Sequence, residues 1–210
     1  MKNMLGIIFM LIAFQSSVFA QMKEMNDKQE FEQKLKQTAK NVKSIESDFT
    51  QLKHLDIFDN DISSKGKFYY RHNNKICMDY TSPVNYLIVI NGDKLKTVAD
   101  GKKSVVNLGS NKSMKEMRSM LAACMSGDLS RISSDYDLEY FEDTKYYLII
   151  VKPKNKTVRD YISDFHIYLD KKDMSVDKLR ISENTIDYTN YQFSNKKFNS
   201  LQNDEKFSVN

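Results

Sequence analysis

Residue types that carry out chemistry in proteins are few in this sequence, and their spacing does not favour a catalytic site. The three histidines, His54, His72 and His166, are scattered, and none lies in a zinc-binding or nucleophile-elbow pattern. Carboxylate pairs such as Asp59 and Asp61 lie in polar, turn-rich segments, where solvated charge is the usual explanation. We therefore predict that the chain is not an enzyme and has no metal site and no cofactor. An active site assembled from distant residues is the alternative.

The first 20 residues predict a secretory signal peptide. Lys2 is its one basic residue, an apolar run follows over 4–14, and the segment ends in the sequence Val18-Phe19-Ala20. A membrane anchor is the alternative, but the apolar run is about half of the ~20 residues that span a bilayer. We therefore expect export and cleavage near Ala20. Because the first cysteine is Cys77, we expect no lipid on the new N-terminus.

Residues 21–210 predict a single domain, because a chain of this length can bury about 70% of its unfolded surface around one core. The formal net charge of +4 is spread along the chain. A basic stripe and a recognisable module, which nucleic-acid binding requires, are both missing. With two prolines, six glycines and no low-complexity run, the sequence gives no sign of a flexible linker.

Hydrophobic periodicity predicts the order helix, strands, helix, strands. Phe31, Leu35 and Ala39 recur at helical spacing, and Asn26 can cap this helix over 27–43. A second helix is expected over 113–126. Turn signals such as Asn91-Gly92 and Asp100-Gly101 suit antiparallel hairpins, which makes the fold class α+β. The expected strands cover residues 45–55, 62–72, 75–81, 85–91, 94–99, 103–108, 136–142, 145–153, 161–170, 176–183 and 186–194.

Several short motifs in this order resemble the LolA-type family of periplasmic outer-membrane lipoprotein carriers. The motifs are Phe49-Thr50-Gln51, Gly66-Lys67-Phe68-Tyr69-Tyr70, Tyr80-Thr81-Ser82-Pro83, Asn91-Gly92-Asp93-Lys94-Leu95 and, near the end, Asp204-Glu205-Lys206-Phe207. Each motif alone is weak, but their order and spacing together are fairly specific. The resemblance covers nearly the whole chain after the predicted signal peptide.

This resemblance implies an unclosed antiparallel β-barrel, a strongly curved sheet, whose concave face is covered by the two helices as a lid. It also implies a monomeric periplasmic carrier that shields the acyl chains of lipoproteins. The implied partners are acylated lipoproteins, an inner-membrane lipoprotein-releasing transporter and an outer-membrane acceptor of unknown identity. A carrier of another amphiphile, such as a glycolipid or a polyene lipid, and a protein-binding module on the same scaffold are the alternatives.

Strand parity and the resemblance together predict which residues line the lipid cavity. Alternate residues of a strand share a face, so Phe68 and Tyr70 lie on one side and Tyr69 on the other. The register of the strand over 85–91 stays open, because apolar residues occupy both of its faces. Ordinary core packing is the alternative for each residue. The predicted lining, including residues of the methionine-rich helix, is Phe68, Tyr70, Ile76, Met78, Tyr80, Ile88, Met114, Met117 and Leu121.

The resemblance also implies a lid latch, meaning a side chain of the sheet that hydrogen-bonds backbone carbonyls of the covering helix. The family often carries an arginine at the position of His72, whereas here the arginine is its neighbour Arg71. A histidine latch would be weaker or pH-sensitive. A local bulge that turns Arg71 inward, or no latch at all, is the alternative.

The two cysteines predict free thiols. A pair of cysteines in an exported chain is ordinarily interpreted as one disulfide. However, Cys77 lies between Ile76 and Met78, so if these two residues face the concavity, Cys77 faces outward. Cys124 shares the apolar stripe of the second helix, which the resemblance places on the concave side. The two thiols would then lie on opposite faces of the sheet, too far apart to bond.

Overall fold

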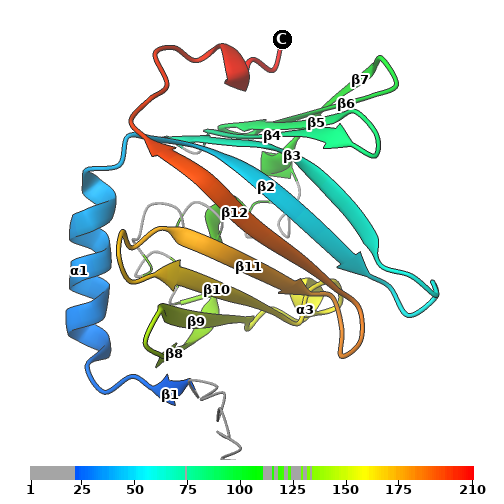
Figure 1. Ribbon diagram of the computed structural model, residues 1–210. Helices are drawn as coiled ribbons and strands as arrows, with labels where there is room; N and C mark the ends of the chain where they lie inside the picture. The colour runs from blue at the N-terminus through cyan, green and yellow to red at the C-terminus, as the bar shows by residue number, and fades with distance from the viewer. Residues whose placement is uncertain are drawn as a thin grey trace, which may run out of the picture.

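The computed structural model describes residues 22–73, 75–110 and 134–210, together with Lys115, Arg118, Ser119, Met120, Ala123, Leu129 and Ile132. These residues form one antiparallel sheet of 12 strands in the order β1-β8-β9-β10-β11-β12-β2-β3-β4-β5-β6-β7. The sheet is strongly curved but does not close, because β1 and β7 are its two edges (Figure 1). The predicted signal peptide lies outside the described residues.

Strand bounds agree with the sequence prediction to within a few residues at most ends. The strands are β1 (Lys23–Glu24), β2 (Ser44–His54), β3 (Ile62–Arg71), β4 (Lys75–Ser82), β5 (Tyr86–Asn91), β6 (Lys94–Ala99), β7 (Lys102–Asn107), β8 (Tyr136–Glu142), β9 (Tyr146–Pro153), β10 (Asp164–Asp170), β11 (Val176–Ser182) and β12 (Tyr188–Phe198). A short 3-10 turn, η1 (Leu108–Ser110), follows β7, and a second, η3 (Glu205–Phe207), lies near the C-terminus.

Helix α1 (Lys28–Lys40) confirms the first predicted helix and buries the expected stripe of Phe31, Leu35 and Ala39. It runs beside the ends of β8 to β11 (Figure 1). The predicted cap was wrong by one residue. Asp27, not Asn26, is the N-cap, and its carboxylate accepts a hydrogen bond of 2.9 Å from the Glu30 backbone N–H.

Three features differ from the sequence prediction. A helix of four residues, α3 (Lys156–Arg159), precedes β10, so this strand begins at Asp164 and not at residue 161. Strand β12 continues to Phe198, beyond the predicted end at residue 194, because the register shifts between Ser194 and Lys197 and pairing with β2 then resumes. The edge strand β1 was not predicted.

Tight turns join most of the strands. β6 and β7 are joined by Asp100 and Gly101, with φ of 49° and 74°, the left-handed conformation that two-residue hairpin turns require. Gly92 has φ of 57° in the turn between β5 and β6. These short turns make sequence neighbours pair in space, so the alternation of side chains continues from strand to strand.

The core lies on both faces of the sheet. We call the face that bears Phe49 and Phe68 the inner face, because α1 and the described helical residues Met120 and Ala123 belong to the same buried cluster. The opposite face, the outer face, carries a smaller cluster of Tyr69, Cys77, Val89 and Phe207. None of the described helices is long and apolar enough to cross a membrane.

Candidate functional site

The inner face of the sheet is the candidate site, and its strands β2 to β4 place the predicted lining residues there. Phe68, Tyr70 and Ile76 are buried in the inner cluster. Met78 and Tyr80 are partly buried and pack against it. Strand parity and the family resemblance together had placed these five residues on one face, and the pairing of β3 with β4 agrees with this placement.

The open register of the strand over 85–91 is resolved by its pairing. Ile88 lies opposite Met78 and Ile90 lies opposite Ile76, so both belong to the inner face. Val89, between them, lies opposite Cys77 in the outer cluster. Both faces of β5 are apolar because both faces of the sheet are covered at this point.

Gly66 on β3 lets the aromatic side chains of neighbouring strands meet. A Cβ at this position would lie 2.2 Å from the Asp79 carbonyl oxygen and 2.8 Å from the ring of Phe49. The ring of Phe49 therefore occupies the space of a side chain on β3. There it makes an edge contact with Tyr80, with the ring centroids 4.9 Å apart.

A polar cluster lies within this aromatic surface. The Tyr80 hydroxyl donates a hydrogen bond of 2.7 Å to Gln51 Oε1, and the hydroxyls of Tyr80 and Tyr191 are 3.4 Å apart. Burial raises the pKa of Tyr80, and the negative charge that Tyr191 would carry raises it further. Burial also raises the pKa of Tyr191. Both phenols therefore keep their protons at neutral pH. The sequence prediction missed Gln51 and Tyr191 as site residues.

The segment over 111–133, between η1 and β8, is described at a few positions. Met120 and Ala123 are helical and buried in the inner cluster, together with Leu129 and Ile132. Arg118 donates a hydrogen bond of 3.0 Å to the Gly92 carbonyl and forms an ion pair with Asp93, both in the turn between β5 and β6. The predicted lining residues of this helix, Met114, Met117 and Leu121, and the thiol of Cys124, lie outside the described residues.

The described inner side chains are tightly packed. A crevice of about 10 Å³ lies beside Phe68, Phe193 and Ile45, whereas ligand pockets are typically about 300–1,000 Å³. This crevice is therefore too small to hold an acyl chain.

Arg71, one of the two predicted latch residues, lies against the C-terminal segment. Its guanidinium donates to the Leu201 carbonyl and forms an ion pair of 2.9 Å with Asp204. The side chain is therefore directed at the outer side and not at the covering helix, which corrects the alternative of an inward-turned arginine. His72 is half-buried, with its ring 6.3 Å from that of Tyr70. Its role as a latch stays a prediction.

The C-terminal segment covers the outer cluster on β3 to β5. The side chain of Phe207 is fully buried against Tyr69, Cys77 and Val89. Lys75 forms an ion pair of 2.5 Å with Asp204, and the hydrogen bond and charge of Lys75, with the charge of Arg71, lower the pKa of Asp204. Cys77 is free and faces outward, which confirms its predicted side of the sheet.

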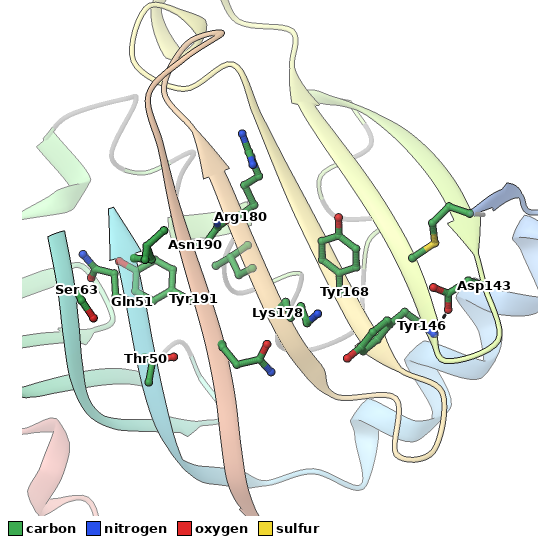
Figure 2. Close-up of a pocket in the computed structure, with 14 residues that line it drawn as sticks. Thr50, Gln51, Ser63, Asp143, Tyr146, Tyr168, Lys178, Arg180, Asn190 and Tyr191 are labelled. Carbon is green, nitrogen blue, oxygen red and sulfur yellow. Dashed lines mark hydrogen bonds between the residues drawn. The ribbon is translucent and has the colours of Figure 1, made fainter. Parts of the chain in front are cut away.

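The outer face also carries an open polar groove of about 610 Å³, which crosses β9 to β12 and β2 (Figure 2). Tyr146 donates a hydrogen bond of 2.8 Å to Asp177, and the ammonium of Lys178 lies 5.0 Å from the centre of the Tyr146 ring. Arg180 lies 3.8 Å from the centre of the Tyr188 ring. Charged side chains such as Lys178 and Arg180 line this groove together with apolar residues such as Met22 and Leu52.

The histidines give no sign of a catalytic arrangement. His54 lies 2.7 Å from Asp61 in the loop end of the β2–β3 hairpin. His166 lies on β10, where burial lowers its pKa despite the nearby charge of Asp164. Among the described residues, no group of histidines, cysteines and carboxylates could hold a metal ion.

Comparisons with known proteins agree with this geometry. Residues 40–210 match the family described as outer membrane lipoprotein carrier protein LolA. No curated protein matches the chain at a significant level.

Three solved structures illustrate the likeness of the fold. A conserved protein from Thermus thermophilus is 8% identical with a TM-score of 0.53, over 85% of this chain and 93% of that one. A LolA superfamily protein from Nitrosomonas europaea is 12% identical with a TM-score of 0.43, over 84% and 96%. Lipoprotein LppX from Mycobacterium tuberculosis is 13% identical with a TM-score of 0.45, over 82% and 96%. At 8% identity, the likeness to the Thermus protein shows the fold alone.

Proposed function

This chain belongs to the LolA family of outer membrane lipoprotein carrier proteins, and on that basis we propose that it shields the acyl chains of lipoproteins and carries them between the two bacterial membranes. In this proposal, residues 1–20 are a signal peptide and the mature protein works in the periplasm as a monomer. It takes acylated lipoproteins from an inner-membrane transporter and delivers them to an outer-membrane acceptor. It carries out no catalysis and needs no cofactor.

One observation carries this proposal. The inner face holds an apolar cluster whose members Met78, Tyr80 and Ile90 are only partly buried. Burial of apolar surface is worth about 25 cal/mol per Å². An acyl chain laid on these residues would therefore be removed from water without directional contacts, which suits a carrier of varied cargo.

We propose that the helix over 113–126 is the lid. Met120 and Ala123 occupy the space above the sheet, and Arg118 holds this segment to the turn between β5 and β6. Displacing these two side chains would expose Phe68 and Ile76 to a ligand. In the open form, Met114, Met117 and Leu121 would complete the lining, because unbranched methionine side chains repack easily around ligands of different shape.

The test is to isolate the protein from the envelope of cells that express the full chain, and to identify bound molecules by mass spectrometry. We expect lipoproteins, or acylated peptides derived from them. If the bound molecule is a glycolipid or another non-protein amphiphile, the cargo is that amphiphile and not a lipoprotein. Protein without any bound lipid, which also fails to take acylated lipoprotein from vesicles, would contradict the carrier proposal.

A matched pair of variants tests whether the inner face binds the lipid. Ile88 and Val98 lie on the adjacent strands β5 and β6, both are half-buried, and they face opposite sides of the sheet. Ile88→Glu places a charge on the inner face, where an unpaired ionised group is costly. We expect the variant to retain ~10-fold less lipid than the parent, whereas Val98→Glu retains the parental amount. Equal retention by both variants would contradict the assignment of the inner face.

A further inference from the structure

The inner face changes character along strand β2. Phe49 is buried in the inner cluster, the amide of Gln51 follows on the same face, and Lys53 comes next. The ammonium of Lys53 forms an ion pair of 2.9 Å with Glu183 at the loop end of β11. One face of a single strand therefore passes from aromatic, through neutral polar, to charged. The same order is found along an amphiphile from its tail to its head group.

The neutral polar part of the inner face consists of three side chains from three strands. Gln51 on β2 pairs directly with Tyr191 on β12, and the two residues lie side by side on the neighbouring strands (Figure 2). Tyr80 on β4 pairs with Gly66 on β3, and its hydroxyl reaches Gln51 on β2, the next strand beyond. The ring of Tyr191 also lies 6.4 Å from that of Phe193, in a stacked arrangement.

Two side chains of this cluster, Gln51 and Tyr191, can still donate hydrogen bonds to a ligand. The one proton of the Tyr80 hydroxyl is used in the bond of 2.7 Å to Gln51 Oε1. The amino group of Gln51 carries two N–H donors, and within the described part of the chain neither has a hydrogen-bond partner. The Tyr191 hydroxyl can turn its proton toward a ligand, because its contact with Tyr80 is as long as 3.4 Å. A hydrogen bond formed in such an apolar surrounding is stronger than one formed in water.

We propose that Gln51, Tyr80 and Tyr191 form a subsite that binds the carbonyl oxygens of ester- or amide-linked acyl chains. The inference rests on the proposed function, because it names the part of the ligand that this face recognises. The hydrocarbon tails extend from the subsite over Phe49 and Phe193. The polar head lies toward Lys53 and Glu183.

The subsite makes the protein selective for chains that are joined through a carbonyl group. A dialkyl ether lipid has the same tails but no carbonyl oxygen, so it leaves the donors of Gln51 and Tyr191 without acceptors. Donors that lose their contact with water when the lipid covers them, without gaining an acceptor, are costly. One or two hydrogen bonds correspond to a ratio of affinities of about 10.

The experiment compares two synthetic lipopeptides that share one peptide and one chain length. The first carries two ester-linked acyl chains and the second carries two ether-linked alkyl chains. With the full chain, we expect the ester form to bind ~10-fold more tightly than the ether form. Gln51→Leu and, separately, Tyr191→Phe should reduce this ratio to about 1.

The variants have a matched control and a safeguard. Gln192→Leu makes the same change on the neighbouring residue of β12, which faces the outer side, and should leave the ratio unchanged. Tyr191→Phe removes a single oxygen and keeps the ring contacts, so it reports on the subsite if Gln51→Leu fails to fold.

The outcomes separate the two proposals. Equal binding of ester and ether forms by the parent overturns the subsite and leaves the carrier function standing. An ester preference that survives in both inner-face variants also overturns the subsite. Failure of the parent to bind either lipopeptide overturns the carrier function and the subsite with it.

Discussion

The inner and outer clusters lie on opposite faces of the same strands, β3 to β5, but they differ in how their margins are covered. The outer cluster is small; the fully buried side chain of Phe207 packs in it, and Leu87, Leu201 and Val209 are partly buried at its margin. The inner cluster is larger, and its margin holds partly buried residues such as Met78 and Tyr80. Leu201 and Val209 at the outer margin belong to the C-terminal segment that covers the cluster. Met78 and Tyr80 at the inner margin lie on a strand of the sheet, where a ligand can be added.

Polar groups distinguish the two clusters further. On the outer side, the ion pairs of Asp204 with Arg71 and Lys75 lie beside the cluster and fix the segment that covers it. On the inner side, the hydroxyls of Tyr80 and Tyr191 lie within the aromatic surface itself. Polar groups inside an apolar surface lower stability unless they have partners. Their position within the inner face is therefore consistent with a role in binding.

The largest effect that we predict separates the two clusters by stability. Phe207→Ala removes a fully buried ring from the outer cluster and should lower the free energy of unfolding by about 3–5 kcal/mol. Urea unfolding measures this change. Phe198→Ala is the control, because the Phe198 side chain is 37% exposed and its loss should cost much less.

The same variant tests whether the clusters are independent. Phe207→Ala protein that remains folded should bind the ester-linked lipopeptide with the affinity of the parent. A loss of binding in the folded fraction would show that the outer seal and the inner face are coupled through the sheet.

A smaller effect is predicted at Gly66, where the inner face depends on a missing side chain. Gly66→Ala brings a Cβ against the Asp79 carbonyl and the Phe49 ring, and such overpacking costs about 1–3 kcal/mol. Thermal unfolding measures the loss. Gly109→Ala is the control, since its nearest contact would be the flexible side chain of Asn107 at 3.1 Å. Equal losses in both variants would argue against a special role of Gly66.

Much of this comparison could be predicted from the sequence. Alternation separated Phe68 from Tyr69 and Cys77 from Ile76 and Met78, because a strand has a strict period of two. The family resemblance then placed Ile76 and Met78 on the face of Phe68. The turn residues Asp100 and Gly101 marked a hairpin, because their left-handed conformation excludes most other residues.

The parts that could not be predicted depend on pairing between distant segments. Gln51 and Tyr191 meet because β12 pairs with β2, and no local pattern sets that register. The outer groove likewise gathers Tyr146, Lys178 and Arg180 from distant parts of the chain. The four residues of α3 are too few to show helical periodicity, and the extension of β12 depends on an irregularity near Asn195, with φ of 53°.

The smallest predicted effect concerns the reactivity of the Cys77 thiol, which reports on the outer seal without altering the inner face. Burial raises the pKa of Cys77 to about 12, and the charge of Asp79 adds to this rise. Because the thiolate is the reactive form, about one molecule in ten thousand would be reactive at pH 8. In a Cys124→Ser background, where Cys77 is the one remaining thiol, a thiol-specific reagent should label native protein very slowly and denatured protein completely.

Asp204→Asn weakens the ion pairs that hold the C-terminal segment, so labelling should become faster while lipid binding stays the same. Asp187→Asn, in the turn between β11 and β12, is the control and should label at the parental rate. Native labelling as fast as that of denatured protein would show that Phe207 does not seal the cluster, and the contrast between a closed outer face and a binding inner face would then fail.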